Sequence, residues 1–263
     1  MNSKNSPILS LQTVTILAWM MLLIRFIQEI FLREIKGREI IGQLEVLYLK
    51  NDFREKLYSI KHFFAVKNRN EINKKYTAKQ RKRLKNDNFS IISSNCIGGF
   101  IYHRLGKQFL SPTINLYFNQ KEFIKFAQNL RYYITLPLEF IETDFDFPVA
   151  KIGDITLYFL HYSNNDEAKE AWERRKTRIN YDNLYLIVYD KDGLTDDDYK
   201  AFGQINCKNR IILSDNENTK YSYFKKIIKK NSYNDNKYFI KDKNGIRTFE
   251  EQWDFVDWLN KSS

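Results

Sequence analysis

The stretch FSIISSNCIGGFIYHRLG, residues 89–106, decides how the fold is interpreted. It opens with a short apolar run, FSIIS, which is typical of a buried strand. The run breaks at Ser-Ser-Asn-Cys, and IGGFIYHRL then continues with apolar residues at helical spacing. A strand followed directly by a helix is the usual start of an α/β unit. Cys96, one of only two cysteines in the chain, lies at the break.

The alternation of predicted strands and helices continues to the end of the chain. Apolar runs at 112–118, 154–162, 183–190 and 210–215 predict further strands, and amphipathic segments at 120–134, 165–180 and 248–260 predict helices. Alternating strands and helices favour a parallel sheet. We therefore expect an α/β fold with a mainly parallel sheet flanked by helices.

The N-terminal region, residues 1–36, is predicted to be a hydrophobic helical extension. Residues 5–24 carry no charge, and that length is close to the ~20 residues that a helix needs to cross a bilayer. Three interpretations are open: a membrane anchor, an amphipathic helix lying in the membrane interface, or a buried or partner-binding helix. Arg25, Arg33, Lys36 and Arg38 follow the uncharged segment. If it spans, they place the rest of the chain on the cytoplasmic side of the plasma membrane; without an anchor the protein is expected to be cytoplasmic.

Residues 37–88 are predicted to form a helical and basic linker region, followed by a catalytic-type domain at 89–263. A dense run of Lys and Arg occupies residues 74–85. A solvated face is the favoured interpretation, and contact with an anionic membrane surface is the alternative. No nucleic-acid partner is expected, because the run lacks interleaved aromatic residues. The formal net charge of +11 does not decide between these interpretations.

Cys96 is the first candidate catalytic residue. It follows the carboxyl end of a predicted strand, where ligands of open α/β sheets gather, and it opens a helix, whose dipole would lower the thiol pKa. Gly98 and Gly99 would let a substrate approach the backbone closely, with His103 nearby on the same helix. The alternative is that Cys96 is a small buried core residue.

A nucleophilic cysteine needs a base, and His161 is the best-placed histidine. It closes the predicted strand 154–162. If that strand runs parallel to 89–93, His161 and Cys96 emerge at the same edge of the sheet, with Asn95 or Asp154 available to orient the imidazole. The alternative is a histidine that simply ends a strand.

The second candidate constellation is a row of arginines on the helix 165–180. Arg175 shares a face with Ala168, Trp172 and Ile179, so it is expected on the buried side. A buried arginine needs a carboxylate such as Asp154 or an anionic ligand group. Arg174 and Arg178 lie beside it and would suit a phosphate or pyrophosphate; an internal ion-pair network is the alternative.

No metal and no cofactor are expected from the motifs. The acidic loop DKDGLTDDD, residues 190–198, has glycine at its fourth position, whereas a calcium loop needs it at the sixth. The chain also lacks a P-loop, a GxGxxG sequence and a zinc signature.

Several motifs together carry a resemblance: FSIISSNCIGGFIYHRLG, SPTINLYF, FIKFAQNLRYYI, FPVAKIGDITLYFLHY, EAKEAWERRKTRIN and CKNRIILS. In this order they resemble a bacterial family known as domain of unknown function 1919, often labelled exopolysaccharide biosynthesis proteins. The resemblance covers roughly residues 72–213. It implies an α/β fold and a setting in capsule, exopolysaccharide or lipopolysaccharide biosynthesis. Tryptophan usually follows the motif cysteine there, whereas Ile97 does here.

Asn95-Cys96, His161 and the arginine row are also similar to a papain-like cysteine peptidase family, which favours the Cys96–His161 pair by analogy. The expected function is a membrane-associated transferase that modifies a sugar or lipid-linked sugar. It is expected to be acyltransferase-like, with Cys96 and His161 catalytic and the arginines holding an anionic group. The alternatives are a glycosyltransferase with a structural Cys96 and a non-enzymatic assembly or regulatory protein. Other polysaccharide-assembly proteins are expected partners.

Overall fold

The computed structural model describes residues 24–25, 27–28, 41–191, 193–216, 220–228 and 245–261. The chain divides into two compact units, Met1–Val66 and Lys67–Ser263, and each is described by itself. The predicted anchor at 5–24 lies outside the described residues apart from Ile24. None of the helices in the described ranges is long and apolar enough to cross a membrane.

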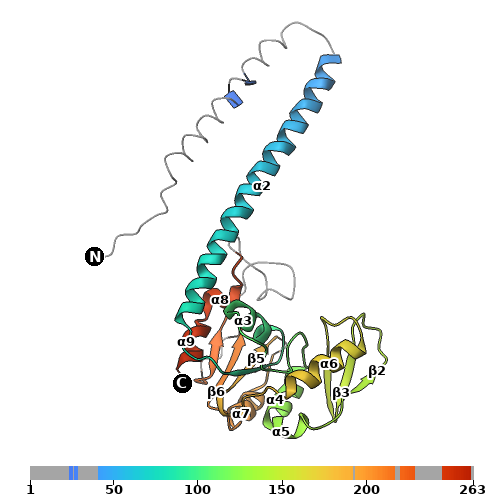
Figure 1. The fold of residues 1–263 in the computed structure, drawn as a ribbon, viewed down its shortest axis with the longest axis vertical. Helices are drawn as coiled ribbons and strands as arrows, with labels where there is room; N and C mark the ends of the chain where they lie inside the picture. Colours follow the sequence, from blue (N-terminus) through green and yellow to red (C-terminus); the bar gives the residue numbers. More distant parts are fainter. Residues whose placement is uncertain are drawn as a thin grey trace, which may run out of the picture. The chain divides into compact units, whose positions relative to one another are not determined.

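One long helix, α2 (Ile41–Arg83), occupies much of the region predicted as a helical and basic linker (Figure 1). No proline lies between residues 41 and 88, so nothing forces the helix to stop earlier. Arg81, Lys82 and Arg83 form its last turn, where cations interact favourably with the helix dipole. Residues 67–83 of α2 belong to the second unit.

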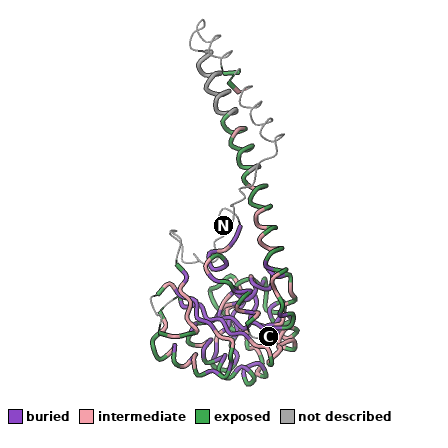
Figure 2. Tube along the Cα trace, turned by 90° about the vertical axis from the view of Figure 1, so that its left-hand side faces the viewer, coloured by how far each residue is buried: buried purple, intermediate pink, exposed green. Residues whose placement is uncertain are grey.

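The second unit is built on sheet A, in which all strands are parallel. Its order is β1 (Ser90–Ser93), β5 (Leu184–Asp190), β6 (Asn209–Ser214) and β7 (Phe224–Lys226). Figure 2 shows buried residues gathered in the interior of this unit. β1 is buried throughout, whereas the edge strand β7 is half-buried. Both faces are covered, as expected for parallel strands: Ile187 and Tyr189 pack into one core, and Leu186 and Val188 into the other. The prediction of a mainly parallel sheet is confirmed.

Helices cover the two faces of sheet A (Figure 1). On one face lie α3 (Ile97–Leu105), α8 (Thr248–Gln252) and α9 (Phe255–Asn260). The opposite core is formed by α4 (Gln120–Gln128), α5 (Leu130–Tyr133), α6 (Asn165–Lys176) and α7 (Asp196–Gly203). A 3₁₀ turn, η2 (Tyr181–Asn183), leads into β5. The predicted flanking helices are thus present, with breaks near residues 129 and 253.

The predicted strand at 154–162 is not part of the parallel sheet. Its core forms β4 (Ile155–Tyr158) of sheet B, which is antiparallel with β2 (Glu139–Ile141) and β3 (Val149–Ile152). Gly153 at φ 60° supplies the left-handed turn that folds β4 back onto β3. The geometry assumed for the Cys96–His161 pair, two parallel strands ending at one edge, is therefore wrong.

The predicted strand at 112–118 is also wrong. Asn115 has a φ of 64°, which interrupts an extended backbone, and only Tyr117 forms a β-bridge, with Tyr158. The segment instead covers the outer edge of β1: the Ser93 N–H donates to the Thr113 hydroxyl at 3.0 Å. The segment thus provides hydrogen-bond partners for backbone groups at the outer edge of β1, which could otherwise pair with another strand.

Candidate functional site

The carboxyl end of β1 joins three segments of the second unit. The Ser94 N–H donates to the Ile187 carbonyl at 2.9 Å, and the Ser94 hydroxyl accepts from the Tyr189 N–H at 2.9 Å. The Ser94 carbonyl accepts from the Phe118 N–H at 3.0 Å. Asn95 and Cys96 therefore lie where β1, β5 and the 114–118 segment meet.

The start of α3 is capped by residues of this same edge. The Asn95 Oδ1 atom accepts from the Ile97 N–H at 3.1 Å, and the Ser93 hydroxyl accepts from the Gly98 N–H at 3.2 Å. These bonds satisfy amides that a helix start leaves open. Asn95 thus has a capping role here, whereas the sequence suggested that it orients His161.

Cys96 is enclosed rather than presented to solvent. The residue is only 8% exposed, and burial raises the pKa of its thiol to about 11. The shift of the thiol pKa is thus opposite to the lowering expected at a helix start. Desolvation opposes the thiolate, and the nearest helix amides are already capped.

His161 is exposed and lies beyond the end of β4. Its backbone N–H donates to the Asn115 carbonyl at 3.4 Å. The Asn115 side chain also lies close to α3: a Cβ atom added at Gly99 would be 3.9 Å from the Asn115 Oδ1 atom. Asn115 therefore links the Cys96 helix to the His161 backbone. Within the described ranges no hydrogen bond joins the Cys96 thiol to the His161 ring, so their catalytic pairing stays a prediction.

Asp154 lies at the other end of β4 from His161. Its carboxylate pairs with Lys125 and accepts from the Tyr133 hydroxyl at 2.8 Å. The hydrogen bonds from Lys125 and Tyr133 lower the pKa of this exposed carboxyl group. The structure therefore places Asp154 neither beside His161 nor beside Arg175.

The two glycines after Cys96 differ in their surroundings. A Cβ at Gly98 would lie 2.7 Å from the Ser93 hydroxyl oxygen, so glycine is needed for α3 to pack against β1. A Cβ at Gly99 would meet Ile114 at 3.4 Å, an ordinary contact. His103 lies on the exposed face of α3.

The arginine row divides into unlike members. Arg174 is exposed and pairs with Glu170 at 3.3 Å. Arg175 is half-buried, and its guanidinium donates to the Tyr162 hydroxyl and, at 3.5 Å, to the Ile114 carbonyl. It also lies 5.3 Å from the centre of the Phe109 ring. In the described part of the chain Arg175 has no carboxylate partner.

Arg178 is half-buried too, and its side chain has no hydrogen bond or ion pair among the described residues. The Tyr162 hydroxyl also donates to the Ile114 carbonyl, at 2.9 Å, so Tyr162 and Arg175 share this acceptor next to Asn115. The 114–115 segment thus contacts both Gly99 of α3 and Arg175 of α6. Asp154, His103 and Arg174 lie outside these contacts.

Arg104 is a buried residue that the sequence interpretation missed. It forms a two-pronged ion pair with Glu250, at 2.7 and 2.8 Å, and donates to Asn73 and Thr77 of α2 at 2.5 and 2.7 Å. A signal was present, since Arg104 falls in helical phase with Ile97 and Ile101. Its described contacts are internal, which indicates a structural role.

Asp190, at the carboxyl end of β5, is another buried charge. Its carboxylate accepts from the N–H groups of Gly193 and Leu194 and from the hydroxyls of Tyr199 and Ser214, at 2.9 to 3.2 Å. These bonds explain why a carboxylate is stable there. Asp190 is thus engaged in holding the loop after β5.

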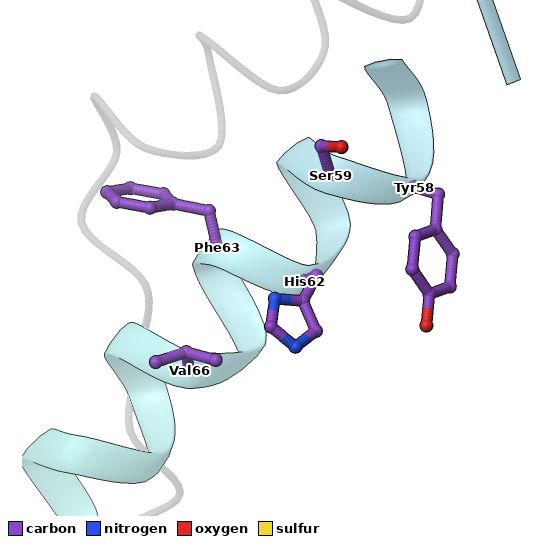
Figure 3. Close-up of a pocket in the computed structure, with 5 residues that line it drawn as sticks. All are labelled: Tyr58, Ser59, His62, Phe63 and Val66. Atoms are coloured by element: carbon purple, nitrogen blue, oxygen red, sulfur yellow. The ribbon is translucent and has the colours of Figure 1, made fainter. Parts of the chain in front are cut away.

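A hollow on α2 in the first unit is lined by Tyr58, Ser59, His62, Phe63 and Val66 (Figure 3). All five side chains come from one helix, and the Tyr58 and His62 rings stack at 6.3 Å. The described residues thus form one wall only, which does not define a binding site.

Comparison with known proteins places these features in a family. An uncharacterized protein of Haemophilus influenzae is 35% identical over 182 residues, which cover 68% of this chain and 88% of that protein. The profile described as Domain of unknown function (DUF1919) matches residues 66–260, nearly the whole second unit. The similarity to papain-like peptidases stays a prediction. This chain belongs to the DUF1919 family.

Proposed function

We propose that this protein is a transferase of capsule, exopolysaccharide or lipopolysaccharide biosynthesis that acts on a sugar or lipid-linked sugar bearing an anionic group. The setting in surface-polysaccharide biosynthesis is the one that the resemblance to this family implies, and the chain belongs to the family. The second unit supports a ligand site, because open α/β sheets bind ligands at the carboxyl ends of their strands.

Arg175 is the observation that carries the proposal. Its guanidinium is half-buried and its described hydrogen-bond partners are a hydroxyl and a carbonyl, both uncharged. A partly buried guanidinium is stabilised by an anion, and its fork geometry suits phosphate or carboxylate. Arg178, two residues after the end of α6, is half-buried and would supply a second cation for the same group.

Binding of inorganic pyrophosphate tests this site on the purified protein. The Arg175→Gln variant should weaken the affinity about 10- to 100-fold, the effect of losing a hydrogen bond to a charged group. Arg174→Gln is the matched control, because Arg174 is exposed and already paired with Glu170. Equal affinities of the two variants would count against an anion site at Arg175.

The role of Cys96 separates the two enzymatic versions of the proposal. In an acyltransferase, His161 would take the proton from the Cys96 thiol and pass it to the carrier group that leaves the acyl donor as the thioester forms. A sugar hydroxyl would then take the acyl group from the thioester and release the thiol. The burial of Cys96 and the raised pKa of its thiol favour a sugar transferase in which the cysteine is structural. Cys96→Ala should then leave the polymer unchanged; a polymer lacking an acyl substituent would establish the acyltransferase instead.

The proposed location is the cytoplasmic side of the plasma membrane. Support comes from the uncharged sequence at 5–24 and the basic residues 74–85, which suit an anionic membrane surface. Separation of a bacterial lysate into membrane and soluble fractions tests it. Recovery of the full-length protein in the soluble fraction at low salt would contradict membrane association.

A further inference from the structure

Four aromatic rings form a cluster outside both hydrophobic cores of the second unit. Tyr117 and Tyr158 stack at 4.6 Å with ring planes 5° apart, and Phe145 and Phe147 stack at 5.0 Å. The pairs meet nearly at right angles, since Phe145 contacts Tyr158 at 87° and Phe147 contacts Tyr117 at 71°. We call these four residues the aromatic platform.

The aromatic platform is partly open to solvent. Phe145 is 52% exposed, and the other three rings are half-buried. Exposed aromatic rings that gather in one place commonly mark a binding surface. The packing of sheet B does not require Phe145, because the hydrophobic side chains of β3 and β4 are already buried in the core beneath.

Polar groups without internal partners surround the rings. In the described part of the chain the Tyr117 and Tyr158 hydroxyls make no hydrogen bond, and the exposed carboxylates of Asp144 and Asp146 form no ion pair. Asp144 and Asp146 flank Phe145 on the loop between β2 and β3. The platform therefore offers the exposed Phe145 ring and three half-buried rings, bordered by hydrogen-bond donors and acceptors.

The aromatic platform adjoins the Asn95–Cys96 edge through one short segment. Asn115 reaches Gly99 of α3, and Tyr117, two residues later, bridges to Tyr158 with both backbone hydrogen bonds formed, at 2.9 and 3.0 Å. Leu116 and Phe118 are buried, whereas Asn115 and Tyr117 on the same segment are half-buried. A ligand on the rings could therefore extend toward the candidate site.

From this arrangement we infer that the aromatic platform binds the sugar rings of a carbohydrate chain. The C–H face of a pyranose is apolar and weakly positive, so it packs on the negative face of an aromatic ring. Its hydroxyls then meet the tyrosine hydroxyls and the carboxylates at the rim. A quaternary ammonium ion would also suit rings and carboxylates, but it would leave the tyrosine hydroxyls without a hydrogen-bonding group. The choice of a carbohydrate rests in part on the proposed function.

A printed array of bacterial capsular and lipopolysaccharide glycans, probed with the full-length protein, tests the inference. The wild-type protein should bind at least one glycan, and Phe145→Ala should weaken that binding about 3- to 10-fold through the lost ring contact. Tyr158→Phe, which removes only a hydroxyl, should weaken it less. Tyr132→Ala is the matched control, because Tyr132 is 61% exposed and lies on α5, outside the platform.

Three results would overturn the inference: no glycan bound by the wild-type protein, equal binding by Phe145→Ala, or displacement of the glycan by millimolar tetramethylammonium but not by free sugar. Arg174→Gln keeps the rings and lies outside the candidate site, so it should bind the array normally. Glycan binding by the protein, together with an unchanged polymer in a gene-deletion strain, would refute the proposed function alone. An altered polymer in that strain, together with no glycan binding, would refute the platform alone.

Discussion

The Cys96 thiol shows how burial and helix position oppose each other at a single residue. A helix start favours the thiolate, but enclosure raises the thiol pKa to about 11. At pH 8 the thiolate is therefore much rarer in the folded protein than in the unfolded chain, where a cysteine has an ordinary pKa of about 8.5.

Alkylation by iodoacetamide should therefore be slow in the native protein and should rise steeply only as the pH approaches 11. The measurement uses a Cys207→Ser background, so that only Cys96 reacts, with the urea-unfolded protein as the control. A native reaction that reaches half its maximum near pH 8 or below would show that the thiol is activated.

Arg104 and Glu250 form a buried pair whose side chains are 6% and 0% exposed. Glu250→Gln would leave the arginine charge buried without its counter-ion, and such a loss costs about 3–5 kcal/mol. Urea denaturation should show this decrease in the free energy of unfolding. The control is Asp254→Asn, which removes the partly exposed partner of Arg83 and should cost at most about 1 kcal/mol. Equal losses in the two variants would contradict the assignment.

At the level of elements, α3 depends on one glycine and tolerates the other. Gly98→Ala should destabilise the protein by about 1–3 kcal/mol, because its Cβ would push against Ser93 and disturb the cap of the Gly98 N–H. Gly99→Ala should be neutral or stabilise by up to ~1 kcal/mol through helix propensity. Thermal denaturation of both variants tests the pair. A stable Gly99→Ala protein without activity would point to close substrate approach at that position.

The elements also show what the sequence can and cannot predict. The apolar runs that became β1, β5 and β6 were identified correctly, because strands buried on both faces have few polar residues. The placement of β4 was missed, since its apolar pattern does not reveal that Gly153 turns it back onto β3. The same holds for the site. Asn95 and Cys96 lie at the carboxyl end of β1, as predicted. The predicted placing of His161 and Asp154 beside them assumed that β4 belongs to the parallel sheet.

At the level of the whole molecule, the end of α2 is part of the second unit. Asn73 and Thr77 bind Arg104, and the Tyr76 hydroxyl donates to the Glu250 carbonyl at 3.0 Å. A fragment spanning 67–263 should therefore unfold cooperatively, whereas one spanning 89–263 should be less stable by several kcal/mol through its unpaired buried groups. Circular dichroism melts of the two fragments make the comparison, and equal melting temperatures would exclude a structural role for this part of α2.

The composition of the surface polysaccharide tests the central claim most directly. The gene is deleted in its bacterium, and the strain is complemented with the wild-type protein, Arg175→Gln or Arg174→Gln at matched protein levels. We predict that deletion removes a sugar or a substituent from the polymer, that wild type and Arg174→Gln restore it, and that Arg175→Gln does not. An unchanged polymer in the deletion strain, or full restoration by Arg175→Gln, would contradict the account.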